Sequence, residues 1–325
     1  MGPSGLTTND ASPPGALSAG RWKRKGAGRK ADSLFAFLAA GCGVLVLLAL
    51  AYMVISTTRT ALPAFRAEGL SFVTGSNWDP SNGSYQILPF IYGTVVTSVI
   101  ALILAVPMSV GVALFLTEYA PKWLRAPIEY AVDLLAAVPS VVYGLWVLWV
   151  VLPYVLRPVS DFLARYLGFI PIFAGPSTGL SYFAAGIILS IMITPIITSL
   201  SREVFRSVPS ADRHAAYALG ATRWEMIKEA VLPRSRGGVV GATMLGLGRA
   251  LGETIVVAML IGNSPIINTS IFKPGGSIAG AIANGWGEAT GIQISALVGA
   301  GVVLFVITII VNMIARAIVY RFNRA

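Results

Sequence analysis

The segment His214–Pro233, HAAYALGATRWEMIKEAVLP, decides the fold, because this polar stretch lies between two long apolar runs. Ser210 and Asp212, just before it, carry side chains of the kind that cap helices, so we predict a helix starting near residue 211. Gly220 predicts a turn, Thr222 predicts a second cap, and the final proline predicts the end of a second short helix. The segment therefore predicts two short helices joined by a glycine turn.

The composition predicts a membrane protein. Of the 325 residues 55% are apolar and only 12% are charged, and the mean hydropathy is +0.75. Soluble domains have about 45–50% apolar and about 25% charged residues, so soluble, disordered and coiled-coil classes are excluded. A bilayer core requires about 20 apolar residues per spanning helix. Six segments meet this length: Ser33–Ser56, Leu88–Leu116, Tyr130–Leu156, Gly179–Leu200, Val239–Gly262 and Ile292–Ala315.

The basic residues predict the orientation of these spans. Most of the 24 Lys and Arg residues lie before the first span, after the second, after the fourth or after the sixth. The positive-inside rule then puts both termini and the 201–238 loop in the cytoplasm. The net charge of +10 is thereby explained without nucleic acid, and the basic amino-terminal cluster is expected to contact anionic membrane lipid.

The predicted fold class is therefore all-α integral membrane, with six transmembrane helices and both termini inside. The expected order is a disordered basic tail (1–32), a first transmembrane helix (33–56), an extracytoplasmic loop (57–87), a core of five transmembrane helices with the 201–238 loop (88–318), and a cytoplasmic end (319–325). Each span must be helical, because lipid offers no partner to an unpaired backbone amide.

A charged pair lies inside the fifth predicted span. Arg249 and Glu253 are four residues apart, so on a continuous helix they share one face. Each costs roughly 2.5–3.5 kcal/mol at a helix centre on insertion scales, so they are expected to face protein or water. Gly248 and Gly252 have the spacing that lets a neighbouring helix approach closely. Two interpretations remain open: a buried ion pair that only fixes packing, or an arginine that offers its guanidinium to an anion in a transport pathway.

The polar loop carries a family pattern. Ala215-Ala216, three residues, Gly220, and then Leu232-Pro233 resemble the EAA loop of ABC importer permeases, in which Glu-Ala-Ala, three residues, Gly, nine residues, Ile, one residue and Leu-Pro follow one another. His214 replaces the family Glu, and Ala230 replaces the Ile. The resemblance implies a type I importer permease fold whose EAA coupling helices fit an ATP-hydrolysing subunit. The implied coupling residues are Asp212, His214, Ala215, Ala216, Gly220, Ala221, Leu232 and Pro233.

Further stretches resemble the PstC family of phosphate importer permeases. They are Leu245–Thr254, Asn77–Pro80 with Leu88–Thr94, Phe115–Pro121 and Val138–Gly144. The resemblance implies import of inorganic phosphate by alternating access, with Arg249, Glu253 and Thr254 in the substrate pathway. It also implies a bacterial plasma (inner) membrane location and several partners: a PstA-like second permease subunit, two PstB-like ATPase subunits, and a PstS-like phosphate-binding protein outside.

Other classes are less consistent with the sequence. The chain has no Gly-x-x-x-x-Gly-Lys-Ser/Thr phosphate loop, so ATP and magnesium are expected on the partner ATPase and no cofactor on this chain. His214 is the only histidine and Cys42 the only cysteine, so no metal site and no enzyme activity is expected. A permease for sulfate or molybdate remains an alternative, because these permeases share the Arg-Ala-Leu-Gly-Glu core. An ATP-independent anion transporter would leave the EAA-like loop unexplained.

Overall fold

The computed structural model describes residues 27–176 and 178–322, and the chain divides into two compact units, Met1–Met53 and Val54–Ala325. In the first unit the described residues all belong to helix α1 (Ala27–Glu68), whose last part lies in the second unit. Most of the predicted tail and residues 323–325 are outside the described part. The first helix continues past the predicted end at Ser56, because Ala61 and Ala64 are buried against the second unit's core.

The segment between α1 and the next long helix forms a small folded cap on the second unit. It contains α2 (Ser71–Thr74) and a two-stranded antiparallel hairpin, β1 (Trp78–Asp79) and β2 (Ser84–Tyr85), joined by the turn η1 (Pro80–Asn82). In its register Trp78 lies opposite Tyr85. The Trp78 ring contacts Tyr85 and Phe90 edge to face, at centroid distances of 5.4 and 5.2 Å. The predicted loop 57–87 is therefore largely structured.

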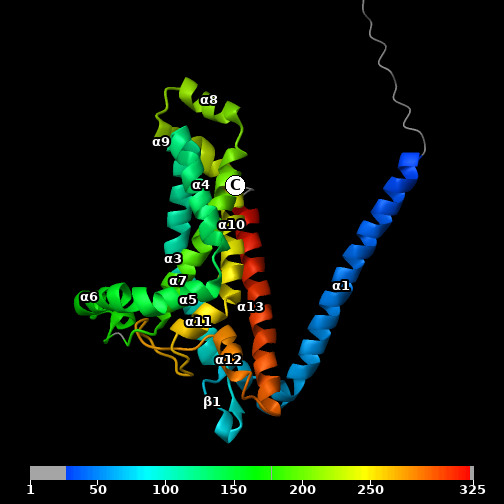
Figure 1. The fold of residues 1–325 in the computed structure, drawn as a ribbon, viewed down its shortest axis with the longest axis vertical. Coiled ribbons are helices and arrows are strands. Elements are labelled where there is room, and N and C mark those ends of the chain that lie inside the picture. The colour runs from blue at the N-terminus through cyan, green and yellow to red at the C-terminus, as the bar shows by residue number, and fades with distance from the viewer. Residues whose placement is uncertain (1–26, 177, 323–325) are drawn as a thin grey trace, which may run out of the picture. The chain divides into compact units, whose positions relative to one another are not determined.

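The centre of the second unit is the pair α3 (Leu88–Leu114) and α7 (Tyr182–Arg206). They run side by side with α10 (Leu232–Gly252) and α13 (Ile292–Phe322) (Figure 1). Small residues allow this close approach: Ala101, Ala105 and Ala185 are fully buried, and a Cβ on Gly186 would lie 2.5 Å from Ile100. Both helices remain continuous through internal prolines. The predicted spans Leu88–Leu116 and Gly179–Leu200 are thus confirmed as helices, apart from a few residues before Tyr182.

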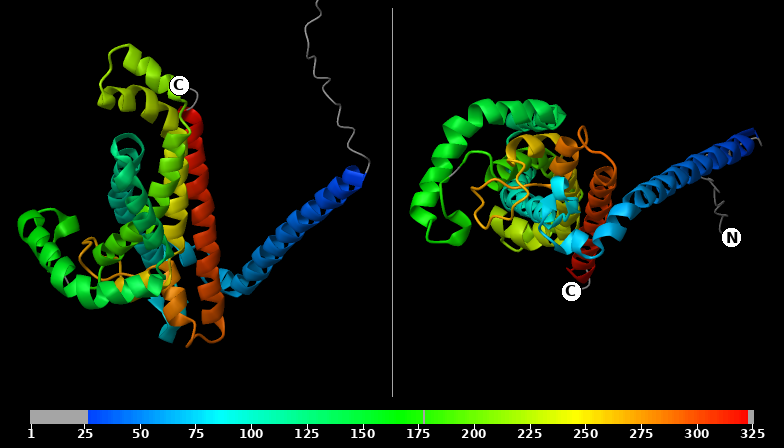
Figure 2. Two further views of the ribbon diagram at one scale, coloured as in Figure 1. Left: turned by 45° about the horizontal axis from the view of Figure 1, so that its top comes forward. Right: turned by 90° about the horizontal axis from the view of Figure 1, so that it is seen from below.

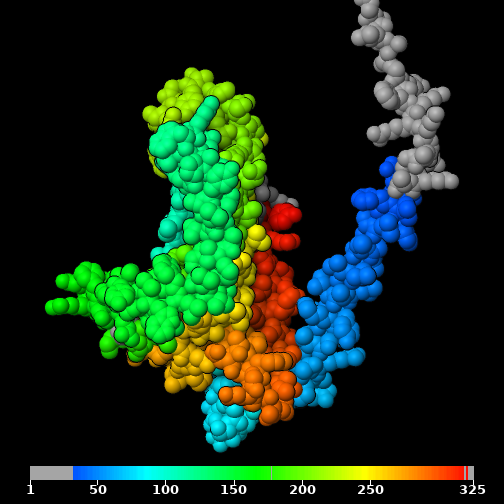
Figure 3. All heavy atoms as spheres, viewed as in Figure 1, coloured from blue at the N-terminus to red at the C-terminus, as the bar shows by residue number. Residues whose placement is uncertain are grey.

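Pro139, inside the predicted span Tyr130–Leu156, suggests a kink or a broken turn, and the structure has a break at this residue. Helix α4 (Lys122–Ala137) ends before Pro139, since the residue before a proline favours extended backbone, and Val138 has ψ 128°. Beyond the proline the chain forms α5 (Ser140–Trp146), the π-helical η3 (Val147–Leu156) and α6 (Arg157–Leu167). This second arm leaves the direction of α4 and stands out sideways from the bundle (Figures 2 and 3).

The predicted span Val239–Gly262 is also interrupted. Helix α10 (Leu232–Gly252) ends at Glu253, and a separate short helix, α11 (Ile255–Leu260), follows Thr254. Outside the 201–238 loop and the turn after α3, the other elements are η4 (Pro171–Phe173), α12 (Ile278–Gly285) and α13 (Ile292–Phe322). Within the described residues, five helices are long and apolar enough to cross a membrane: Asp32–Glu68, Leu88–Tyr119, Ser140–Leu167, Tyr182–Arg206 and Ile292–Ala317. The count of six spans remains a prediction.

Candidate transport pathway and coupling loop

The polar loop forms the helix-turn-helix that its sequence predicts. Helix α8 (Ser210–Ala218) is followed by Gly220 with a φ of +83°, a left-handed conformation that glycine adopts without strain. Helix α9 (Arg223–Met226) begins after Thr222 and continues through the π-helical η5 (Ile227–Val231) into α10. This loop lies at the opposite end of the second unit from the β-hairpin (Figure 1).

The cap of α9 is the predicted one, but the cap of α8 is not. The side chain of Thr222 accepts a hydrogen bond from the Glu225 amide, while the Glu225 carboxylate accepts one from the Thr222 amide at 2.8 Å. The Thr222 amide, followed by its hydroxyl, lowers the pKa of Glu225. The predicted caps Ser210 and Asp212 are wrong, because Pro209 occupies the N-cap position and no side chain caps α8. Asp212 pairs instead with Arg234 at 3.3 Å.

Pro233 does not end the second helix. The proline lacks an amide hydrogen and would clash with a carbonyl four residues earlier in an ordinary α-helix. The π-helical turn Ile227–Val231 immediately before it widens the backbone at this point, and the proline falls in the first turn of α10. The helix therefore passes from the coupling loop into the bundle without a break.

The EAA-like residues fall into an outer and an inner set. His214 and Ala215 are exposed on α8. Three large side chains of the loop that the sequence pattern did not single out are also exposed: Tyr217 on α8, Leu219 just after it, and Trp224 on α9. Ala216 and Leu232 instead pack against a buried apolar cluster, and the Ala221 amide bonds to the Ala216 carbonyl at 3.1 Å. The outer set is exposed, and the inner set packs within the loop.

Arg249 and Glu253 are not arranged as a helical pair. Arg249 lies in the last turn of α10, whereas Glu253 has the extended angles φ −70° and ψ 124° and is outside the helix. Among the described residues, the ion pairs join other partners and include neither of these two. Arg249 is exposed, while Glu253 and Thr254 are half-buried. Within the described residues, the ion pair that the sequence suggested between these two charges is therefore not made.

The glycines of α10 face two different environments. A Cβ on Gly238 would lie 2.4 Å from Val204, and one on Gly246 would lie 2.7 Å from Ile197, so these two glycines allow α7 to approach. Gly248 and Gly252 have open space beside them. The predicted close packing at Gly248 and Gly252 is therefore not made by any described helix of this chain, and their face of α10 is uncovered.

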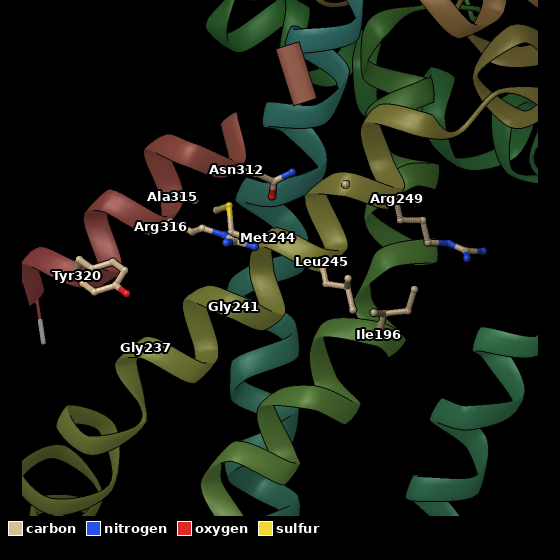
Figure 4. Close-up of a pocket in the computed structure, with 11 residues that line it drawn as sticks. Ile196, Gly237, Gly241, Met244, Leu245, Arg249, Asn312, Ala315, Arg316 and Tyr320 are labelled. Atoms are coloured by element: carbon tan, nitrogen blue, oxygen red, sulfur yellow. The ribbon is translucent and has the colours of Figure 1, made fainter. Parts of the chain in front are cut away.

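The uncovered face borders an open pocket of about 660 Å³. Its lining comes from α7, α10 and α13: Ile196, Gly237, Gly241, Met244, Leu245, Gly248, Arg249, Asn312, Ala315, Arg316 and Tyr320. Figure 4 shows Arg249 on the side of α10 that faces away from α13, and Arg316 on the α13 side beside Met244. Among these described lining residues there is no carboxylate; most are apolar or glycine, and the polar ones are Arg249, Asn312, Arg316 and Tyr320.

Several long apolar helices with a helix-turn-helix loop at one end are the architecture that the sequence resemblance predicts for a transport permease. The family model described as "Binding-protein-dependent transport system inner membrane component" matches residues 105–325, and the chain belongs to this family. It is a multi-pass inner-membrane protein, the non-catalytic permease subunit of an ABC importer that works with ATPase subunits and a binding protein.

Individual relatives agree with this assignment. The chain is 44% identical over 299 residues to the phosphate transport system permease protein PstC of Xylella fastidiosa, covering 91% of this chain and 92% of that one. It is 42% identical to PstC 2 of Mycobacterium tuberculosis, covering 89% and 92%. A bacterial alginate ABC transporter bound to its periplasmic protein has a chain with a TM-score of 0.62 at 19% identity, covering 93% and 99%, which shows a shared fold.

Proposed function

We propose that this chain is a permease subunit of an ATP-driven importer of inorganic phosphate. The observation that carries the proposal is the 44% identity to a phosphate permease along 91% of the chain. The exposed Arg249 beside a pocket without carboxylates supports it, since a guanidinium binds phosphate oxygens in bidentate fashion. Arg249 is the proposed substrate contact, and Glu253 and Thr254 border it at the helix break.

The proposed complex contains a PstA-like permease subunit, two PstB-like ATPase subunits and a PstS-like binding protein. ATP and magnesium bind to the ATPase, and this chain binds no cofactor. Both termini and the α8–α9 loop lie in the cytoplasm, where the exposed Tyr217, Leu219 and Trp224 contact the ATPase. This arrangement agrees with the predominance of basic residues on that side.

Uptake by the purified complex in liposomes tests the proposal. We expect radiolabelled phosphate to accumulate only when ATP, magnesium and the binding protein are present. Excess unlabelled arsenate, which has nearly the same shape and charge, should compete, whereas sulfate should not. Competition by sulfate or molybdate alone would favour the alternative oxyanion permease. Uptake that continues without ATP would instead indicate a secondary transporter.

A further inference from the structure

The end of α3 is joined to the coupling loop by a nearly buried ion pair. Helix α3 continues into the π-helical turn η2 (Phe115–Tyr119). Within it, the Glu118 carboxylate accepts a hydrogen bond from Arg213 of α8 at 3.0 Å, and the two side chains are only 8% and 19% exposed. The same guanidinium donates to the carbonyl of Phe205 at 2.7 Å and to that of Val208. Arg213 therefore connects the end of α7, the turn before α8, and α3.

The next residue of η2 contacts the other coupling helix. The Arg223 guanidinium, at the start of α9, lies over the Tyr119 ring at 5.2 Å from its centroid, a cation–π arrangement. Beneath these two contacts Ala113 of α3 belongs to the same buried cluster as Met226 and Ile227 of the loop. Consecutive residues of η2 thus hold α8 and α9, one helix each.

These contacts matter because α3 is not covalently adjacent to the loop. A displacement of α8 and α9 reaches α7 and α10 through the chain itself, since the loop connects those two helices. It reaches α3 through side-chain contacts, which are the packing of α3 against α7 and α10 and the direct contacts of η2 with the loop. A guanidinium that bonds one carboxylate and two carbonyls in a fixed fork has few alternative positions, and a nearly buried carboxylate that lost this partner would be left without compensation.

We propose that Arg213 and Glu118 are positioning residues that make α3 move together with the coupling loop when the ATPase closes. The proposal rests on the proposed function, because it assigns the step by which ATP hydrolysis is coupled to that permease. Arg213 and Glu118 touch neither the pocket nor the exposed docking surface, so they act through α3.

The experiment uses the whole complex in liposomes and measures two quantities for each variant. The first is phosphate imported per ATP hydrolysed. The second is the change in hydrogen exchange of residues 115–119 between the nucleotide-free and the vanadate-trapped states, which requires no phosphate. The variants are Glu118→Gln, which keeps the shape, and Arg213→Gln, with Arg213→Lys in its place if that variant fails to assemble. Glu229→Gln is the matched control, because Glu229 is on the same loop but 70% exposed.

We expect both variants to assemble and hydrolyse ATP, while import per ATP falls by about five-fold or more. The nucleotide-dependent change in exchange at 115–119 should also disappear, and Glu229→Gln should match the wild type. An unchanged import ratio, a retained exchange change, or an equal loss in Glu229→Gln would each overturn the proposal. If the wild-type complex hydrolyses ATP without importing phosphate, the proposed function fails, and the exchange measurement still decides whether α3 follows the loop.

Discussion

Arg249 is an exposed charge in the last turn of α10. Two physical effects make the position tolerable: a cation is favourable near a helix carboxyl terminus, and the adjacent pocket is open rather than filled by side chains. Arg249 is in none of the ion pairs of the described residues, so its guanidinium donors are not used by a carboxylate of this part of the chain. The structure thereby favours the pathway interpretation of Arg249 over a packing ion pair.

We predict that Arg249→Ala abolishes phosphate uptake at normal protein levels, while Arg249→Lys retains part of it, because lysine keeps the charge but loses the planar fork. Arg236→Ala, another exposed arginine of α10, should leave uptake near the wild-type rate. Uptake rates in cells with matched expression provide the measurement. Wild-type uptake by Arg249→Ala would exclude the assigned role.

We also predict that Arg249 and Glu253 act independently. In a double-mutant cycle with Arg249→Lys and Glu253→Gln, the two effects on the uptake rate, expressed as free energies, should add to within about 0.5 kcal/mol, as for residues without a shared contact. A substantially larger interaction energy would mean that the two side chains bond to each other in the working complex.

One face of helix α10 packs against α7, and another face is not covered by any described helix of this chain. Gly238 and Gly246 permit the α7 contact, whereas a Cβ added at Gly241, Gly248 or Gly252 would meet no atom of another described element within 4 Å. Gly238 and Gly241 are only three residues apart, yet only Gly238 lies against α7. Substitution at the two kinds of position should separate packing within the chain from packing against a partner.

We predict that Gly238→Ala destabilises the chain and Gly241→Ala does not. Alanine favours a helix interior by about 1 kcal/mol over glycine. At position 238 the new methyl group would meet the stiff, branched Val204 at 2.4 Å, and overpacking of this kind costs about 1–3 kcal/mol. Thermal unfolding of the purified chain in detergent should show a lower midpoint only for Gly238→Ala. Equal midpoints for both variants would contradict the α7–α10 contact.

The sequence predicted continuous helices well where only length and apolarity matter, and less well where packing interrupts them. The apolar runs predicted α3, α7 and α13, and Gly220 and Thr222 predicted the turn and cap of the loop. No proline in the sequence marks the break at Glu253. The break depends on the packing of α11 against α5 and α12, which the sequence pattern does not reveal. Pro139 breaks a helix while Pro107 and Pro195 do not, a difference that arises from the surrounding helices rather than from the residue itself.

Long-range ion pairs join the helices near the coupling loop. Glu129 of α4 pairs with Arg202 and Arg206 of α7, the first at 3.5 Å, and Glu118 joins α3 to α8. The interruptions at Pro139 and Glu253 lie in the other direction along the same helices. A displacement of the coupling loop is therefore expected to move the adjacent ends of α3, α4, α7 and α10 together. Bending is expected at Pro139 and Glu253.

The hairpin and the coupling loop lie at opposite ends of the second unit (Figure 1), and we predict that they face opposite sides of the membrane. The orientation can be tested after Cys42, the only cysteine, is replaced by serine. Ser81 in the hairpin turn and Lys228 in the loop are both exposed, so each can be changed to cysteine singly.

We predict that a membrane-impermeant maleimide labels Ser81→Cys in cells with a permeabilised outer envelope and intact inner membrane. Lys228→Cys should react only after that membrane is opened, because the positive-inside rule puts the arginine-rich loop in the cytoplasm. The reverse pattern would invert the proposed topology and remove the α8–α9 surface from reach of any cytoplasmic ATPase.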